Sequence, residues 1–202
     1  MPAQLTHIKY AFGYLERRPE LNRLEFLRGT TFPDIRRLAG LRRDMTHFTG
    51  VTQNDVHMEA DSWQAGLLLH SYLDEAWNRY FSEKGLPADY FPEKTWSAVK
   101  IAEESAYCGR LVGRAEGAAA LQRQATPQEL AFGVAPELLR RWYAFVIWKL
   151  EVPYNTQMWR KHAVEMDFEA AKMERLLGRV EAIRVDSEWL QRIDELHTAL
   201  GY

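Results

Sequence analysis

Cysteine is almost absent from this chain, since Cys108 is the only one in 202 residues. A single thiol excludes an intrachain disulfide framework and a cysteine-rich structural zinc site, and it is typical of proteins from a reducing compartment. Long apolar runs are also lacking, because polar residues interrupt every stretch that approaches the ~20 residues of a membrane span. The first residues show no basic segment followed by an apolar core. We therefore expect a cytoplasmic protein without a transmembrane segment.

An excess of either charge is missing as well. The chain has 26 basic and 28 acidic residues, for a formal net charge of −2. This balance gives no overall attraction to nucleic acid or anionic lipid, so no nucleic-acid partner is expected. One local basic cluster stands out, and its members are Arg36, Arg37, Arg42 and Arg43. The cluster predicts either a solvated basic face or a phosphate-binding surface.

Strand patterns are absent as well. Apolar residues recur at steps of three and four residues, and no run alternates over the length of a strand, which predicts an all-α fold. With 47% apolar residues, the chain can bury a sizeable core and is expected to form one domain. Within that domain we expect an N-terminal part over about residues 1–82 and C-terminal helices over about residues 93–202.

Proline and glycine divide the expected helices. A first helix is predicted to begin at Thr6 as its N-cap and to end at Arg17. The segment Gly29–Pro33 predicts a turn, which leaves Asp34 just after a rigid bend. A long amphipathic helix is predicted over Asp61–Phe81. Further interruptions are expected at Gly85–Phe91, Gly117 and Gly178.

Metal-type ligands are concentrated in the first 74 residues. Imidazole nitrogens and carboxylate oxygens bind zinc and the other metals that catalyse hydrolysis, and here they occur without thiolates. The sequence therefore predicts a hydrolytic metal site built from the following five residues: His7, Asp34, His47, His70 and Asp74.

The pair His70 and Asp74 is the most informative part of this set. A separation of four residues places both side chains on one face of a helix. That face is apolar, and burying two such groups is unfavourable unless they are paired or bind a metal. A structural hydrogen bond between them is the alternative. His57 and Asp61 have the same spacing, but the polar segment around His57 predicts a surface residue.

The remaining candidates are expected to be structural. His162 and His197 lie on charged C-terminal helices and are predicted to face solvent. Glu103 and Glu104 are predicted to be helix-surface charges, with a further metal-ligating carboxylate as the alternative. Aromatic residues at helical spacing predict core positions for Trp63, Tyr72, Trp77, Tyr80 and Phe81.

Four motifs occur in order along the first part of the chain. They are Thr6-His7, the Gly-x-x-x-Pro-Asp-Ile segment Gly29–Ile35, His47-Phe48, and the helix Gly66–Asn78 with the sequence GLLLHSYLDEAWN. In combination they resemble the zinc-dependent phospholipase C family, especially its small bacterial members. The similarity covers approximately residues 5–80.

The resemblance implies an all-helical, phospholipase C-like bundle with a central metal site that hydrolyses phosphate esters. It implies one zinc held by Asp34, His47, His70 and Asp74, and a second held by His7 with a shared Asp74. The N-terminal Trp ligand of the characterised phospholipases has no counterpart here. Their later His and His-x-x-x-Glu ligands are also missing, so we expect one or two ions. A site without thiolates would also accept manganese, iron or nickel.

The leading hypothesis is a metal-dependent hydrolase that acts on a small phosphorylated or lipid-derived compound. Asp34 is predicted to orient or deprotonate the attacking water as well as to bind metal. The basic cluster around Arg36 and Arg43 is predicted to bind the substrate phosphate.

Two alternatives stay open at this level. An HD-type nucleotide phosphohydrolase also uses His and Asp on helices, but this chain has no adjacent His-Asp pair. A non-catalytic helical protein would bind metal for stability or bind a partner through its C-terminal helices. An exposed seam of apolar residues on these helices would point to a homo-oligomer. The seam residues are Leu176, Leu177, Val180, Ile183, Leu190 and Ile193.

Overall fold

The computed structural model describes residues 3–84, 96–107, 111, 113–122, 124–152, 155–165 and 169–200. These residues form helices and connecting loops without any strand, which confirms the all-α prediction. The elements in order are α1 (Gln4–Arg17), α2 (Arg23–Thr31), the 3₁₀ helix η1 (Phe32–Ile35), α3 (Arg36–Ala39), α4 (Arg43–Thr46), α5 (Gln53–Met58), α6 (Ser62–Lys84), α7 (Trp96–Tyr107), α8 (Arg114–Leu121), α9 (Pro127–Leu130), α10 (Pro136–Glu151), α11 (Thr156–Glu165), α12 (Ala170–Arg184) and α13 (Ser187–Ala199).

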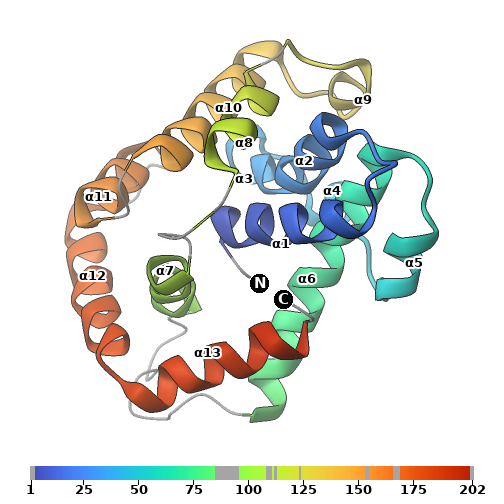
Figure 1. Cartoon of the computed structure of the whole chain (residues 1–202). Helices are drawn as coiled ribbons and strands as arrows, with labels where there is room; N and C mark the ends of the chain where they lie inside the picture. The colour runs from blue at the N-terminus through green and yellow to red at the C-terminus, as the bar shows by residue number, and fades with distance from the viewer. Residues whose placement is uncertain are drawn as a thin grey trace.

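The C-terminal helices curve around the rest of the molecule. Figure 1 shows α10, α11, α12 and α13 as a continuous arc that partly encloses α7, with α1 and α6 beside it. Within this arrangement α2 packs along α6, α7 packs against α12, and α8 packs against α10. Buried residues of the N-terminal and C-terminal parts therefore belong to one hydrophobic core.

Two glycines allow α2 and α6 to approach closely. A Cβ atom on Gly29 would lie 2.2 Å from the carbonyl oxygen of Trp63, and one on Gly66 would lie 2.3 Å from that of Phe26. The predicted turn at Gly29–Pro33 is wrong, because α2 continues to Thr31 and η1 follows directly. Glycine is used here for a helix contact and not as a helix end.

Other predicted boundaries need similar corrections. Thr6 is inside α1, whose N-cap is Ala3. Gly117 and Gly178 lie within α8 and α12 and do not interrupt them. The predicted helix over Asp61–Phe81 is confirmed as α6, which extends to Lys84. The loop predicted at Gly85–Phe91 lies outside the described residues.

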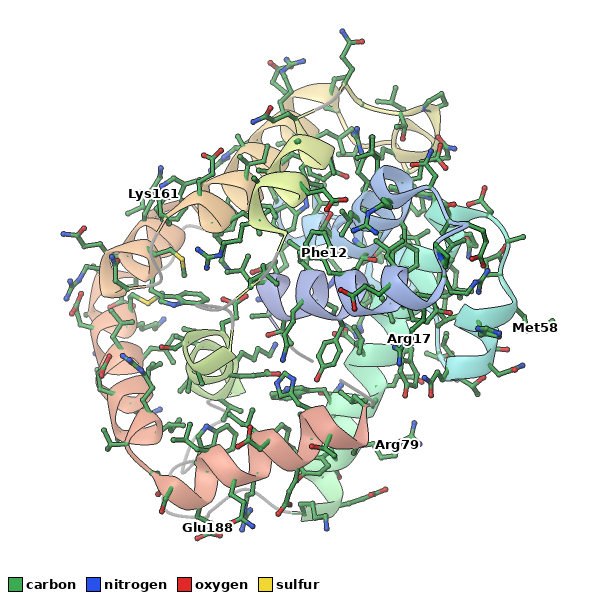
Figure 2. The ribbon with its side chains drawn as sticks, viewed as in Figure 1. Phe12, Arg17, Met58, Arg79, Lys161 and Glu188 are labelled. Atoms are coloured by element: carbon green, nitrogen blue, oxygen red, sulfur yellow. The ribbon has the colours of Figure 1, made fainter. Side chains whose placement is uncertain are left out.

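The predicted core is largely confirmed. Trp63, Trp77 and Phe81 are buried, while Tyr72 and Tyr80 are partly buried and pack against the core. The main seam residues of the C-terminal helices, Leu177, Val180, Ile183 and Ile193, are also buried in this core. They therefore pack within the chain itself and do not form an exposed surface for a second copy. Figure 2 shows Phe12 inside the molecule, whereas Met58, Lys161 and Glu188 lie at its edge.

Candidate metal centre

The five predicted metal ligands lie together in the interior. They are His7 on α1, Asp34 on η1, His47 directly after α4, and His70 and Asp74 on α6. Each has at most 6% of its surface exposed. Ligand atoms of His7, His70 and Asp74 lie within 4.8 Å of one another, and so do those of Asp34, His47 and His70. His70 is common to both groups.

Backbone carbonyls orient two of the three imidazoles. Nδ1 of His70 lies 2.8 Å from the carbonyl oxygen of Thr30, and Nδ1 of His7 lies 3.0 Å from that of Ala3. A carbonyl oxygen only accepts hydrogen bonds, so each of these Nδ1 atoms carries a proton. Each Nε2 atom therefore presents a lone pair to the site, which is the usual arrangement in metal-binding histidines.

A side-chain hydroxyl orients the third imidazole. Nδ1 of His47 lies 2.8 Å from Oγ1 of Thr46, and this hydroxyl donates to the carbonyl oxygen of Pro33 at 3.4 Å. Because the hydroxyl proton is directed at Pro33, its oxygen accepts the Nδ1 proton of His47. All three imidazoles therefore carry a proton on Nδ1 and direct Nε2 into the site.

The Nε2 atoms of the three imidazoles approach one another and Asp74 closely. Nε2 of His47 and Nε2 of His70 are 3.2 Å apart. Nε2 of His7 lies 3.4 Å from Oδ1 of Asp74, and neither atom has a hydrogen-bond partner among the described residues. Buried acceptors that point at each other are unfavourable unless a positive charge lies between them. A bound metal cation would provide that charge.

Burial keeps two of the imidazoles neutral. It is the main cause that lowers the pKa of His47 to about 3 and that of His70 to about 4. Burial alone would raise the pKa of Asp74, but the adjacent His7 and His70 hold it below its usual range. The imidazoles of His47 and His70 and the carboxylate of Asp74 are thus in the form that binds metal at neutral pH.

Asp34 completes the donor set. Burial acts to raise the pKa of Asp34, whereas interaction with the neighbouring His70 and His7, which a protonated ring provides in acid, lowers it, and the net direction is downward. The site therefore contains imidazole nitrogens and ionised carboxylates and no thiolate. This set fits zinc and also manganese, iron or nickel.

Arg43 is the member of the basic cluster that reaches the site. Its Nη2 atom donates to Oδ2 of Asp74 at 2.6 Å, while 43% of its side chain is exposed. The guanidinium therefore connects a buried metal-type ligand with the surface. A planar group with several donors in this position can bind phosphate oxygens.

The other three arginines differ from one another. Arg42 forms a bidentate ion pair with Asp44 on the surface. Arg37 is exposed, and Arg36 is half-buried with an Nε atom that lacks a partner among the described residues. Burial lowers the pKa of Arg36, and the nearby charges of Arg37 and Arg43 act in the same direction.

Lys100 on α7 is a cation that the sequence analysis missed. Burial lowers its pKa, and Asp34 and Asp74 are the carboxylates that act most strongly in the opposite direction. The ammonium group therefore lies within electrostatic range of both. A single lysine on a helix that also carries Glu103 and Glu104 gave no local signal of this position.

Two predictions about surface residues are wrong. His197 is buried, with Nδ1 at 2.7 Å from the hydroxyl group of Tyr10. Glu103 and Glu104 are buried as well, at 1% and 0% exposure, and neither belongs to the metal-ligand groups. His57 is exposed, as predicted, and the side chain of His162 lies outside the described residues.

No family model, no curated protein and no solved structure matches this chain. The resemblance to zinc-dependent phospholipases C thus rests on the four motifs alone. Within the described part of the chain, every helix is too short or too polar to cross a lipid bilayer.

Proposed function

We propose that this protein is a metal-dependent hydrolase of phosphate esters. The observation that carries the proposal is the convergence of three oriented imidazoles and two carboxylates, with unprotonated atoms of His47 and His70 at 3.2 Å. The resemblance of the motifs, which include His7, Asp34 and Asp74, supports the same conclusion. The basic residues near the site favour an anionic substrate, either a small phosphorylated compound or a lipid-derived one.

Zinc is the proposed metal, in one or two ions. The Nε2 atom of His70 has one lone pair, so it binds one ion even though it belongs to both ligand groups. We assign it to an ion shared with Asp34 and His47. A second ion would be held by His7 and Asp74, whose unpartnered atoms face each other.

The protein's own residues then have separate roles. When bound, the metal polarises the phosphoryl group and activates a water for attack. Asp34, on the short η1 helix, would accept the proton of an attacking water. Arg43 binds the phosphate oxygens from the exposed side, assisted by Arg36 and Arg37.

Elemental analysis of the purified protein tests the metal site first. We expect one or two equivalents of a transition metal after zinc loading, and loss of this metal in the His70→Ala/Asp74→Ala variant. His57→Ala is the matched control, because His57 is exposed and belongs to neither ligand group. Circular dichroism of each variant would show whether it is folded. A native protein that binds no metal would refute the proposal.

An activity screen then separates catalysis from a purely structural metal site. The probes are p-nitrophenyl phosphate for monoesterase and bis(p-nitrophenyl) phosphate for diesterase activity. We expect turnover of at least one probe that depends on the metal and is abolished in Asp34→Asn. Stoichiometric metal without turnover of either probe would favour the non-catalytic alternative, a helical protein with a degenerate hydrolase site.

A further inference from the structure

A buried ion pair joins α7 and α10 near the first turn of α1. Nζ of Lys149 on α10 is 3.0 Å from Oε2 and 3.2 Å from Oε1 of Glu104 on α7. Both side chains are fully buried, with 0% exposure. The ammonium group also lies 4.7 Å from the ring centre of Trp159. Removing two charges from water is costly, and apolar residues of similar size often stabilise a core equally well. The pair therefore calls for a role other than stability.

Lys149 also fixes the orientation of a side-chain amide. Its ammonium group donates to Oε1 of Gln4 at 2.9 Å. An ammonium group has only donors, so the amide oxygen must face it and the amide nitrogen must point the other way. That nitrogen, Nε2 of Gln4, lies 3.4 Å from Oδ2 of Asp34 and donates to it. Lys149 is thus linked to the proposed ligand Asp34 through Gln4.

Glu104 fixes the backbone in the first turn of α1, the helix that carries Gln4. Its Oε1 atom accepts a hydrogen bond of 2.7 Å from the backbone N–H of Leu5, one of the first residues of α1. The first four N–H groups of a helix have no partner within the helix, and a carboxylate there also suits the helix dipole. The same turn contains the carbonyl group of Ala3, which orients His7.

We infer that Glu104 and Lys149 are positioning residues of the metal site, which act on His7 and Asp34 through the first turn of α1. This inference rests on the proposed metal centre. The two ligands come from different elements, and the ion pair holds both in one arrangement. Without Lys149, the amide of Gln4 is free to rotate, and its oxygen would then repel the carboxylate of Asp34.

Cobalt binding provides a test that does not depend on turnover. The variants are Gln4→Met, which cuts the link at a half-buried residue, and the double variant Glu104→Leu/Lys149→Met, which leaves no unpaired buried charge. For each folded variant we would measure the dissociation constant of Co²⁺ by chelator competition and record the visible absorption bands of the bound ion. Loss of a hydrogen-bond partner of a metal ligand typically weakens metal affinity by about 10-fold to 100-fold. We therefore expect at least ~10-fold weaker Co²⁺ binding and shifted absorption bands.

A second buried ion pair is the matched control. Arg28 and Glu129 form a bidentate contact at 2.9 and 2.6 Å, with 3% and 0% exposure, and neither contacts Gln4 in the described structure. Glu129→Gln should lower the free energy of unfolding but leave the cobalt spectrum unchanged. If Gln4→Met and the double variant keep the native cobalt affinity and absorption bands, the inference is overturned while the proposed function stands. Absence of metal binding by the native protein would overturn the proposed function, and the inference with it.

Discussion

Gly29 and Gly66 face each other where α2 packs along α6. A Cβ atom on Gly66 would lie 3.0 Å from the carbonyl carbon of Gly29 and 2.3 Å from the carbonyl oxygen of Phe26. This close contact has a consequence for the metal site, because Thr30 follows Gly29 and His70 is one turn after Gly66. The short distance between the helices allows the Thr30 carbonyl group to accept the Nδ1 proton of His70 at 2.8 Å.

Gly66→Ala is therefore expected to destabilise the protein and to disturb the site. The new methyl group meets backbone atoms that cannot rotate away, so we expect a loss of about 2 kcal/mol or more in the free energy of unfolding. Urea unfolding would measure this. Gly178→Ala is the control, because its Cβ atom would enter open space within α12. It should stabilise by about 0.5–1 kcal/mol. Equal effects of the two substitutions would contradict the prediction.

The buried imidazoles predict that the metal-free protein loses stability in mild acid. The ordinary pKa of His is 6.5, whereas folding lowers the pKa of His47 to about 3 and that of His70 to about 4. Below pH 6.5 the unfolded chain thus binds more protons than the folded protein. The free energy of unfolding then decreases as the pH is lowered, by up to about 1.4 kcal/mol per pH unit for each imidazole.

Urea unfolding at a series of pH values in the presence of a chelator would measure this loss. The neutral variant His70→Gln should show a shallower dependence, because one titrating group has been removed. His57→Gln, on the exposed side of α5, should retain the native slope. The prediction fails if native protein and His70→Gln respond to pH in the same way.

Arg43 is expected to act on the substrate and not on the fold. Arg43→Met removes the guanidinium that extends from Asp74 toward solvent. Loss of a charged donor to a phosphoryl group typically lowers the rate by about 10²-fold or more, so kcat/KM for the active probe should fall accordingly. Arg42→Met should behave like the native enzyme, because Arg42 is paired with Asp44 on the surface. Similar losses in both variants would indicate a general charge effect.

Thr46→Val tests the orientation of His47. Valine has nearly the shape of threonine but cannot accept the Nδ1 proton, so the imidazole is free to change tautomer. We expect metal binding to weaken by about 10-fold, as is typical when a metal ligand loses a hydrogen-bond partner. Chelator competition would measure it, with Thr49→Val in the exposed loop as the control. Unchanged affinity in Thr46→Val would show that the hydroxyl does not orient His47.

The residues of the site were predictable because their chemistry conflicts with their surroundings. His70 and Asp74 are polar residues on an apolar helix face, and this conflict is visible in a single sequence. The orienting groups were not predictable in this way. The carbonyl groups of Thr30 and Ala3 carry no side-chain signal, and their role follows from the packing of α1, α2 and α6.

The errors of the sequence analysis have one physical origin. Glu104 resembles a surface charge until its partner Lys149 is known, and these residues are 45 positions apart. His197 is buried by contact with Tyr10, 187 positions earlier in the chain. Gly29 and Gly66 were interpreted through local backbone preferences, although their role is to admit a neighbouring helix. Local patterns predict elements, whereas long-range contacts decide which charges are buried.

The link from α1 to α10 also determines the order in which the site can mature. The five proposed ligands have all left the ribosome well before Lys149 is synthesised, because they lie within the first 74 residues. Until α7 and α10 have packed, Lys149 cannot hold the amide oxygen of Gln4 and Glu104 cannot accept from the N–H group of Leu5. In the proposed scheme, a nascent chain would meet metal ions before these two contacts exist. Selective binding of the ion would then depend on completion of the C-terminal arc.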